Sequence, residues 1–85
     1  MALSIKILVL DDAEDTEDLF TQQFRHQISD GDYVFSFANT GESAQKILEN
    51  ESIDIFVIDI NVAGSDGLEL INELKEKYPT MKTIV

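Results

Sequence analysis

The apolar residues of this chain fall into four short runs separated by longer amphipathic stretches. The first run, Ile5–Leu10, is almost continuous, rich in branched residues and closed by two acids. Such a run is typical of a strand that is covered on both faces, as in a parallel sheet. The pattern predicts three further strands, at residues 33–37, 53–58 and 82–85.

Helical spacing separates these strands. Phe20, Phe24 and Ile28 recur at every fourth position of a helix predicted for residues 14–29, whose first turns carry acids that suit the helix dipole. Thr40 is a candidate N-cap for a helix over residues 41–51, and Pro79 ends a third helix over residues 68–78. The alternation predicts an α/β fold, a parallel sheet with right-handed crossovers. The same repeated units would also fit part of a β/α barrel, so the pattern alone leaves both folds open.

Composition limits the size of the fold and the partners it can take. With 85 residues, the chain is one small domain, residues 1–85. Its 17 acids against 6 bases give a formal net charge of −11, which repels nucleic acids and anionic membrane surfaces. There is no cysteine for disulfides or thiolate metal sites, and no apolar stretch approaches the ~20 residues that span a bilayer. Because the N-terminus also lacks a signal-peptide pattern, we expect a cytoplasmic protein with no direct nucleic-acid or membrane partner.

Three acids follow two of the predicted strands. Asp11 and Asp12 come after the first strand, and Asp59 comes after the third. In an open parallel sheet, ligands bind beyond the carboxyl ends of the strands, and in the flavodoxin-like order the first and third strands are neighbours. The three carboxylates are then expected to converge, where they oppose one another's ionisation unless a cation compensates. Mg²⁺ prefers oxygen ligands of this kind.

Phosphoryl transfer is the chemistry that such a group of carboxylates supports. A carboxylate can act as a nucleophile and form an aspartyl phosphate, and a metal ion offsets the charge that develops. Asp59 stands alone at its strand end and is the candidate nucleophile, whereas the pair Asp11 and Asp12 would hold the metal. Taken singly, an Asp pair before a helix is more often a cap, and an Asp closing a strand is more often a turn residue. Their joint position after the first and third strands favours a site.

Several segments together resemble the receiver domains of two-component signalling. Residues 6–12 resemble the family's first strand and acidic pair, and residues 54–59 resemble its third strand with the phospho-acceptor at the end. Further matches to the family pattern are Ala38, Gly41, Glu42, Ala44, Asp66 and Gly67. The resemblance runs the whole length of the chain, and as a set these motifs are specific.

The resemblance implies a flavodoxin-like sheet of order 2-1-3-4 with helices on both faces. It also implies that Asp59 accepts a phosphoryl group, in the presence of Mg²⁺, from a phosphohistidine on a sensor histidine kinase or phosphotransfer protein. Asp12 would be a direct metal ligand, Asp11 would act largely through water, and the backbone carbonyl of Asn61 would complete the protein's ligands. The chain would then be a phospho-acceptor signalling domain rather than a turnover enzyme.

The chain departs from the family pattern in two places. Ala63 stands where family members usually carry proline. The family's fifth strand and last two helices are missing, and with them a Ser or Thr and a Lys that switch the signalling surface. Lys82 and Thr83 lie too early in the fourth strand for those roles. Because the sheet faces and the final strand then lack cover, we expect a homodimer or a fragment of a longer chain.

Two other functions compete with phosphorylation of Asp59. A non-phosphorylated docking or dimerisation module would fit the missing Ser/Thr and Lys. A Mg²⁺-dependent phosphatase with an Asp nucleophile fits less well, because that class typically carries a second Asp where this chain has Asn61. Outside the acidic group, His26 is interpreted as a solvated surface residue. The phenylalanines are interpreted as core residues: Phe20, Phe24, Phe35, Phe37 and Phe56.

Overall fold

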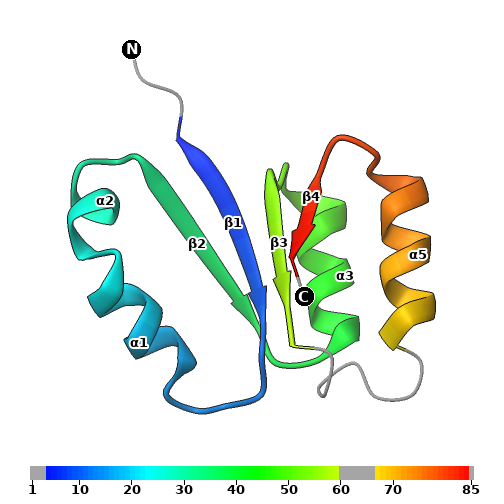
Figure 1. Ribbon diagram of the computed structural model, residues 1–85, viewed down its shortest axis with the longest axis horizontal. Helices are drawn as coiled ribbons and strands as arrows, with labels where there is room; N and C mark the ends of the chain where they lie inside the picture. The colour runs from blue at the N-terminus through cyan, green and yellow to red at the C-terminus, as the bar shows by residue number, and fades with distance from the viewer. Residues whose placement is uncertain (1–3, 60–66, 85) are drawn as a thin grey trace.

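A computed structural model describes residues 4–59 and 67–84, which form a parallel sheet with helices on both faces (Figure 1). The strands are β1 (Ile5–Leu10), β2 (Tyr33–Ala38), β3 (Ile55–Ile58) and β4 (Lys82–Ile84). All three strand pairs are parallel, and the order across the sheet is β2-β1-β3-β4. The flavodoxin-like order predicted from the sequence is therefore confirmed, and the barrel alternative is excluded for the described residues.

The helices are α1 (Thr16–Gln23), α2 (Arg25–Ser29), α3 (Gly41–Asn50) and α5 (Gly67–Lys77). Figure 1 shows α1 and α2 on one face of the sheet, beside β2, and α3 and α5 on the other face. The prediction of one continuous helix over residues 14–29 was wrong. Phe24 has φ −109° and ψ 26°, outside the helical region, so the backbone breaks there and restarts as a short second helix. None of the helices in the described ranges is long and apolar enough to cross a membrane.

The main core lies between the sheet and the pair α3 and α5. Alternate residues of the two central strands point into it, and the largest of them, Phe56, is fully buried. The buried members of this core are Leu8, Leu10, Ala38, Ala44, Leu48, Phe56, Ile58, Ile71, Leu74 and Met81. This packing fixes β1 and β3 side by side, and those two strands lead into the predicted site.

Aromatic rings fill the opposite face, where α1 and α2 cover β2. Neighbouring ring centroids lie 5.5–6.3 Å apart, a spacing typical of tilted and stacked aromatic pairs. The rings belong to Phe20, Phe24, Tyr33, Phe35 and Phe37. All five are only half-buried, so the core prediction is confirmed in full for Phe56 alone.

Cover on this face ends before the last two strands. Phe56 and Ile58 point into the main core, so their neighbours Ile55 and Val57 point to the α1 side, where they are half-buried. Ile84 pairs with Val57 and is 43% exposed. Figure 1 shows α1 beside β2, at the β2 edge of the sheet rather than beside β3 and β4, so those two strands have less cover on this face.

A capping box begins α3 immediately after β2. The side chain of Thr40 accepts a hydrogen bond from the backbone N–H of Ser43 at 3.1 Å, and the Ser43 hydroxyl accepts from the backbone N–H of Thr40 at 3.3 Å. Two amide groups at the helix start are satisfied in this way, as predicted for Thr40. The cap fixes the direction in which the chain leaves the sheet beside Asp11.

Candidate acidic metal and phospho-acceptor site

The predicted site residues lie at the carboxyl edge of the sheet, just beyond the paired strands. Leu10 of β1 is in register with Ile58 of β3, and the next amide, that of Asp59, donates to the Leu10 carbonyl at 2.9 Å. On the other side, the amide of Asp11 donates to the carbonyl of Ala38 at the end of β2, at 3.0 Å. These two hydrogen bonds continue the ladders by one residue, so Asp11 and Asp59 extend from neighbouring strands at the same level.

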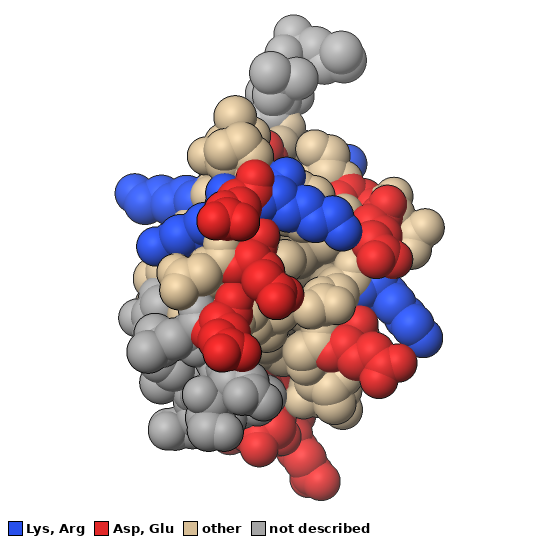
Figure 2. Space-filling model, turned by 90° about the vertical axis from the view of Figure 1, so that its right-hand side faces the viewer, with Lys and Arg blue, Asp and Glu red and all other residues tan. Residues whose placement is uncertain are grey.

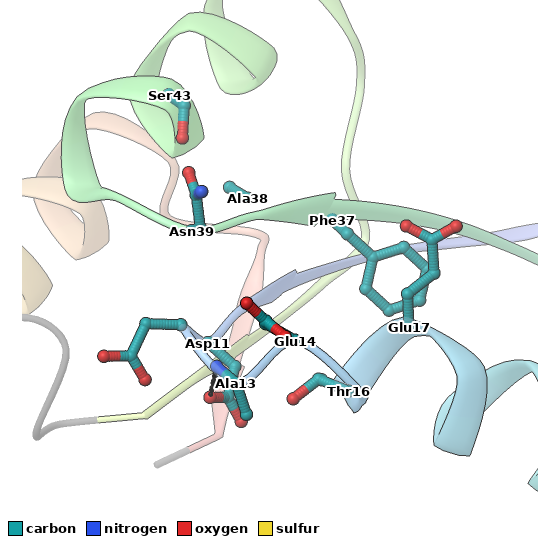
Figure 3. Close-up of a pocket in the computed structure, with 10 residues that line it drawn as sticks. Asp11, Ala13, Glu14, Thr16, Glu17, Phe37, Ala38, Asn39 and Ser43 are labelled. Atoms are coloured by element: carbon teal, nitrogen blue, oxygen red, sulfur yellow. Dashed lines mark hydrogen bonds between the residues drawn. The ribbon is translucent and has the colours of Figure 1, made fainter.

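The three carboxylates converge as the order of the strands predicts. One oxygen from each of Asp11, Asp12 and Asp59 lies within 4.8 Å of the other two. Asp12 is exposed, whereas Asp11 and Asp59 are half-buried. The Asp11 carboxylate also accepts a hydrogen bond from the backbone N–H of Ala13 at 3.0 Å, which orients it over the loop after β1 (Figure 3).

The spacing of these oxygens fits a small divalent cation. Mg²⁺ holds oxygen ligands at about 2.0–2.1 Å, so two oxygens on opposite sides of one ion lie about 4.2 Å apart. The three carboxylate oxygens, within 4.8 Å of one another, therefore lie within a span close to that of the ligands around one such ion. Without a cation they repel one another, and that repulsion favours binding of a positive charge. The fourth predicted ligand, the backbone carbonyl of Asn61, lies outside the described residues, as do Ala63 and Asp66.

A cavity of about 410 Å³ adjoins the acidic group on the side of β2. It lies between the loop after β1, the start of α1 and the loop that leads from β2 into α3 (Figure 3). Its lining residues include Glu14, Thr16, Glu17, Phe37 and Asn39. None of these five residues was predicted from the sequence to be functional. One signal was present, because Thr16 precedes Phe20 and Phe24 at the same four-residue spacing and so shares their inward helix face.

Other residues considered from the sequence lie away from this edge. His26 is exposed on α2, as predicted for a surface residue. The surface that carries α5 mixes acidic and basic side chains (Figure 2). The basic residues of α5 itself, Lys75 and Lys77, belong to the last turn of the helix. That turn is at the opposite end of α5 from the carboxyl edge of the sheet (Figure 1). The acidic group therefore has no compensating lysine from α5.

The chain resembles known proteins in both sequence and fold. Residues 7–85 match the response regulator receiver domain family. The heme response regulator HssR of Staphylococcus aureus (strain bovine RF122 / ET3-1) is 51% identical over 39 residues, which cover 46% of this chain and 17% of HssR. The chain thus spans less than a fifth of the curated relatives it matches.

Solved structures give the same relationship over more of the chain. The response regulator TrrA of Thermotoga maritima, in complex with Mg²⁺ and BeF, matches with a TM-score of 0.77 and 28% identity, covering 95% of this chain and 67% of that chain. The complex of the histidine kinase ThkA with TrrA matches with a TM-score of 0.75 and 28% identity, covering 93% of this chain and 65% of that chain.

The sequence match and the fold match rest on different observations, one on residue identities and the other on the arrangement of the strands. Both cover nearly the whole chain. They converge on one assignment: the chain belongs to the response regulator receiver domains of two-component signalling.

Proposed function

We propose that this receiver accepts a phosphoryl group on Asp59, with Mg²⁺ held by Asp11, Asp12 and Asp59. The observation that carries the proposal is the convergence of three carboxylate oxygens within 4.8 Å at the carboxyl edge of a parallel sheet. The main-chain carbonyl of Asn61 is proposed as a further ligand. The donor is a phosphohistidine on a sensor histidine kinase or a phosphotransfer protein, and the reaction takes place in the cytoplasm.

The residues divide the chemistry between them. Asp59 is half-buried at the end of β3, and its backbone is anchored to β1 by the hydrogen bond to Leu10, so the nucleophile is held in place. Its carboxylate oxygen forms the new bond to phosphorus as the bond from phosphorus to the donor nitrogen breaks, and the electron pair returns to the imidazole. Asp11, oriented by Ala13, and Asp12 supply the remaining carboxylate ligands. When bound, Mg²⁺ would offset the charge on the transferring group.

Incubation with Mg²⁺ and acetyl phosphate, followed by intact-mass spectrometry, tests the acceptor. We expect an adduct of about 80 Da on the wild type and none on Asp59→Asn, because an amide is not a competent nucleophile here. Asp54→Asn is the matched control. Asp54 directly precedes β3, at the opposite end of the strand from Asp59. Its carboxylate accepts a hydrogen bond from the Lys6 amide at 2.9 Å, away from the acidic group. That variant should be phosphorylated like the wild type. A folded wild type that acquires no adduct, or an adduct that persists in Asp59→Asn, would refute the proposal.

The kinase partner is supported by one of the relatives, which is a response regulator in complex with a histidine kinase. The prediction that two copies associate, or that the chain is part of a longer protein, stays a prediction. Leu19, 58% exposed, and Ile84, 43% exposed, lie on the side of the sheet where cover is incomplete and are consistent with it. Light scattering after size exclusion measures association, and a monodisperse, well-folded monomer would exclude the homodimer.

A further inference from the structure

We propose that two copies of this chain join edge to edge through β4, so that Thr83 pairs with the partner's Thr83 across a two-fold axis. Strand β4 comes last in the sheet order, and β3 is its one neighbouring strand among the described residues (Figure 1). The inference specifies a surface for the predicted association of two copies. It does not depend on phosphorylation of Asp59.

The Thr83 hydroxyl lacks a partner within one copy. Its Oγ1 atom is buried and makes no hydrogen bond, and no other side-chain atom among the described residues is in that state. Thr83 is in register with Phe56, whose ring points into the main core, so the threonine side chain lies on the same face of the sheet. A buried hydroxyl left without a partner costs about 1–3 kcal/mol. A second molecule that supplies the missing partner therefore gains free energy on binding.

The backbone of Thr83 faces the open side of β4. The Lys82 amide donates to the Asp54 carbonyl at 3.0 Å, so the N–H and C=O of Lys82 point toward β3. Successive residues of a strand direct these groups to opposite sides. The N–H and C=O of Thr83 therefore point away from β3, and the ladder between β3 and β4 leaves them unused.

A two-fold axis at Thr83 satisfies the backbone and the hydroxyl together. In an antiparallel pair centred there, each Thr83 N–H donates to the carbonyl of the partner's Thr83, and the partner's amide donates in return. The two side chains lie opposite each other on one face, where cross-strand threonines hydrogen-bond through their hydroxyls. Centring the pair on Lys82 or Ile84 would move the two hydroxyls apart.

The positions around Thr83 are complementary in the same register. Lys82 lies opposite the partner's Ile84, which is 43% exposed in one copy, and the apolar stem of the lysine covers it. Centring on Lys82 would instead place two lysines directly opposite each other, which is destabilising. The axis also sets α5 antiparallel to its copy on the shared face. Glu69 in its first turn then lies toward the end that carries Lys75 and Lys77 in the partner.

The dimer is expected to be weak because the contact is short. Strand β4 has three residues, and interfaces below about 1,200 Å² are typical of transient complexes. We expect a dissociation constant of about 10–100 µM, a free energy of about −7 to −5.5 kcal/mol. Sedimentation equilibrium in about 0.15 M NaCl measures it, since a Debye length of about 8 Å screens the repulsion between two chains of net charge −11.

Cysteine cross-linking tests the register, because the chain has no cysteine of its own. In the proposed pair the two Cα atoms at position 83 lie about 5.5 Å apart, inside the range of about 4.4–6.8 Å that a disulfide spans. Thr83→Cys should therefore form a covalent dimer in oxidised glutathione. Ile84→Cys is the matched control. It is the next residue and is exposed, but its copy lies diagonally, about 7–8 Å away, too far for a disulfide.

Two further variants separate the backbone from the hydroxyl. Thr83→Pro removes the outward N–H and leaves the bond from Lys82 to Asp54 in place, as proline does on edge strands, so the folded variant should be monomeric. Thr83→Val keeps the side-chain volume and removes the hydroxyl, so the dissociation constant should rise by about three- to tenfold. Circular dichroism checks that each variant is folded, and the two cysteine variants decide the question if the proline variant is not.

Three results would overturn the inference. The first is a wild type that stays monomeric up to about ten times the expected dissociation constant. The second is cross-linking of Ile84→Cys as efficient as that of Thr83→Cys. The third is a folded Thr83→Pro or Thr83→Val that associates as tightly as the wild type. Phosphorylation of Asp59 is scored separately by mass, so either proposal can fail while the other stands.

Discussion

Replacing Asp59 with Asn should stabilise the metal-free protein, although it removes the proposed acceptor. The reason is repulsion within the acidic group, where carboxylate oxygens lie within 4.8 Å of one another. Two unit charges at that distance repel by about 0.9 kcal/mol in bulk water and by about 3.5 kcal/mol at an effective dielectric constant of 20. Neutralising Asp59 relieves two such pairs, those with Asp11 and Asp12.

The lower end of this range is the appropriate one. Asp12 is exposed and the other two side chains are only half-buried, so water screens much of the repulsion. Asp59 also makes a further interaction in the native state, and any weakening of it by the change offsets part of the gain. We therefore expect Asp59→Asn to be more stable by about 1–2 kcal/mol at low salt. For a chain of this size, each kcal/mol corresponds to about 4–8 °C in Tm.

Thermal unfolding followed by circular dichroism provides the test, in metal-free buffer of low ionic strength, in 1 M NaCl and in Mg²⁺. Salt should shrink the difference, because the Debye length falls to about 3 Å at 1 M. Mg²⁺ should stabilise the wild type by about 2.7 kcal/mol at a hundredfold excess over Kd, and the variant by less, so the order of stabilities reverses. Asp54→Asn, the control at the other end of the strand, should show no such reversal. The reasoning is refuted if Asp59→Asn is less stable than wild type at low salt and responds equally to Mg²⁺.

Three further predictions concern the scaffold. Phe56→Ala should cost about 3–5 kcal/mol in urea unfolding because the ring is fully buried, whereas Leu19→Ala, at a 58% exposed position, should stay within about 0.5 kcal/mol; similar losses at both would contradict the assigned core. Thr40→Ala should cost about 0.5–2 kcal/mol and lower the helical signal in circular dichroism, since it removes the acceptor for the Ser43 amide, and an unchanged stability would count against the cap. Gly31→Ala should destabilise by about 1–2 kcal/mol although no atom lies within 4 Å of the added Cβ, because the φ of +78° is unfavourable for alanine; a neutral result would show that the turn relaxes.

The strands and the meeting of the acids could be predicted from the sequence because both depend on short, regular signals. Ile5–Leu10 reads as a buried strand without any tertiary information, and the order of the sheet places its neighbour directly beside it. Because β1 and β3 are parallel neighbours, Asp11 and Asp59, which directly follow them, must lie at the same edge of the sheet. The loop that carries Asn61 falls outside the described residues, so that ligand stays a prediction.

Tertiary packing decided what the sequence pattern missed. The four-residue spacing of Phe20 and Phe24 predicted one continuous helix, but α1 ends at Phe24. Both rings contact Phe35 of β2, so the spacing reflects packing against the sheet and does not require an unbroken helix. These rings were also predicted to be more buried than they are. The spacing of apolar residues indicates which face of a helix or strand packs inward, but it does not indicate how many other residues cover that face. Thr16 was overlooked because a single threonine at a helix start is more often a solvent-facing residue.

The two strands that carry the acidic group are also the two that are hydrogen-bonded along both sides. β1 lies between β2 and β3, and β3 lies between β1 and β4, whereas β4 has three residues and one described partner strand. Amide hydrogen exchange should therefore be slowest in β1 and β3 and fastest in β4. Transient opening at the rim of the sheet would then leave Asp11 and Asp59 at their mutual spacing, so the geometry for cation binding should outlast local unfolding elsewhere in the domain.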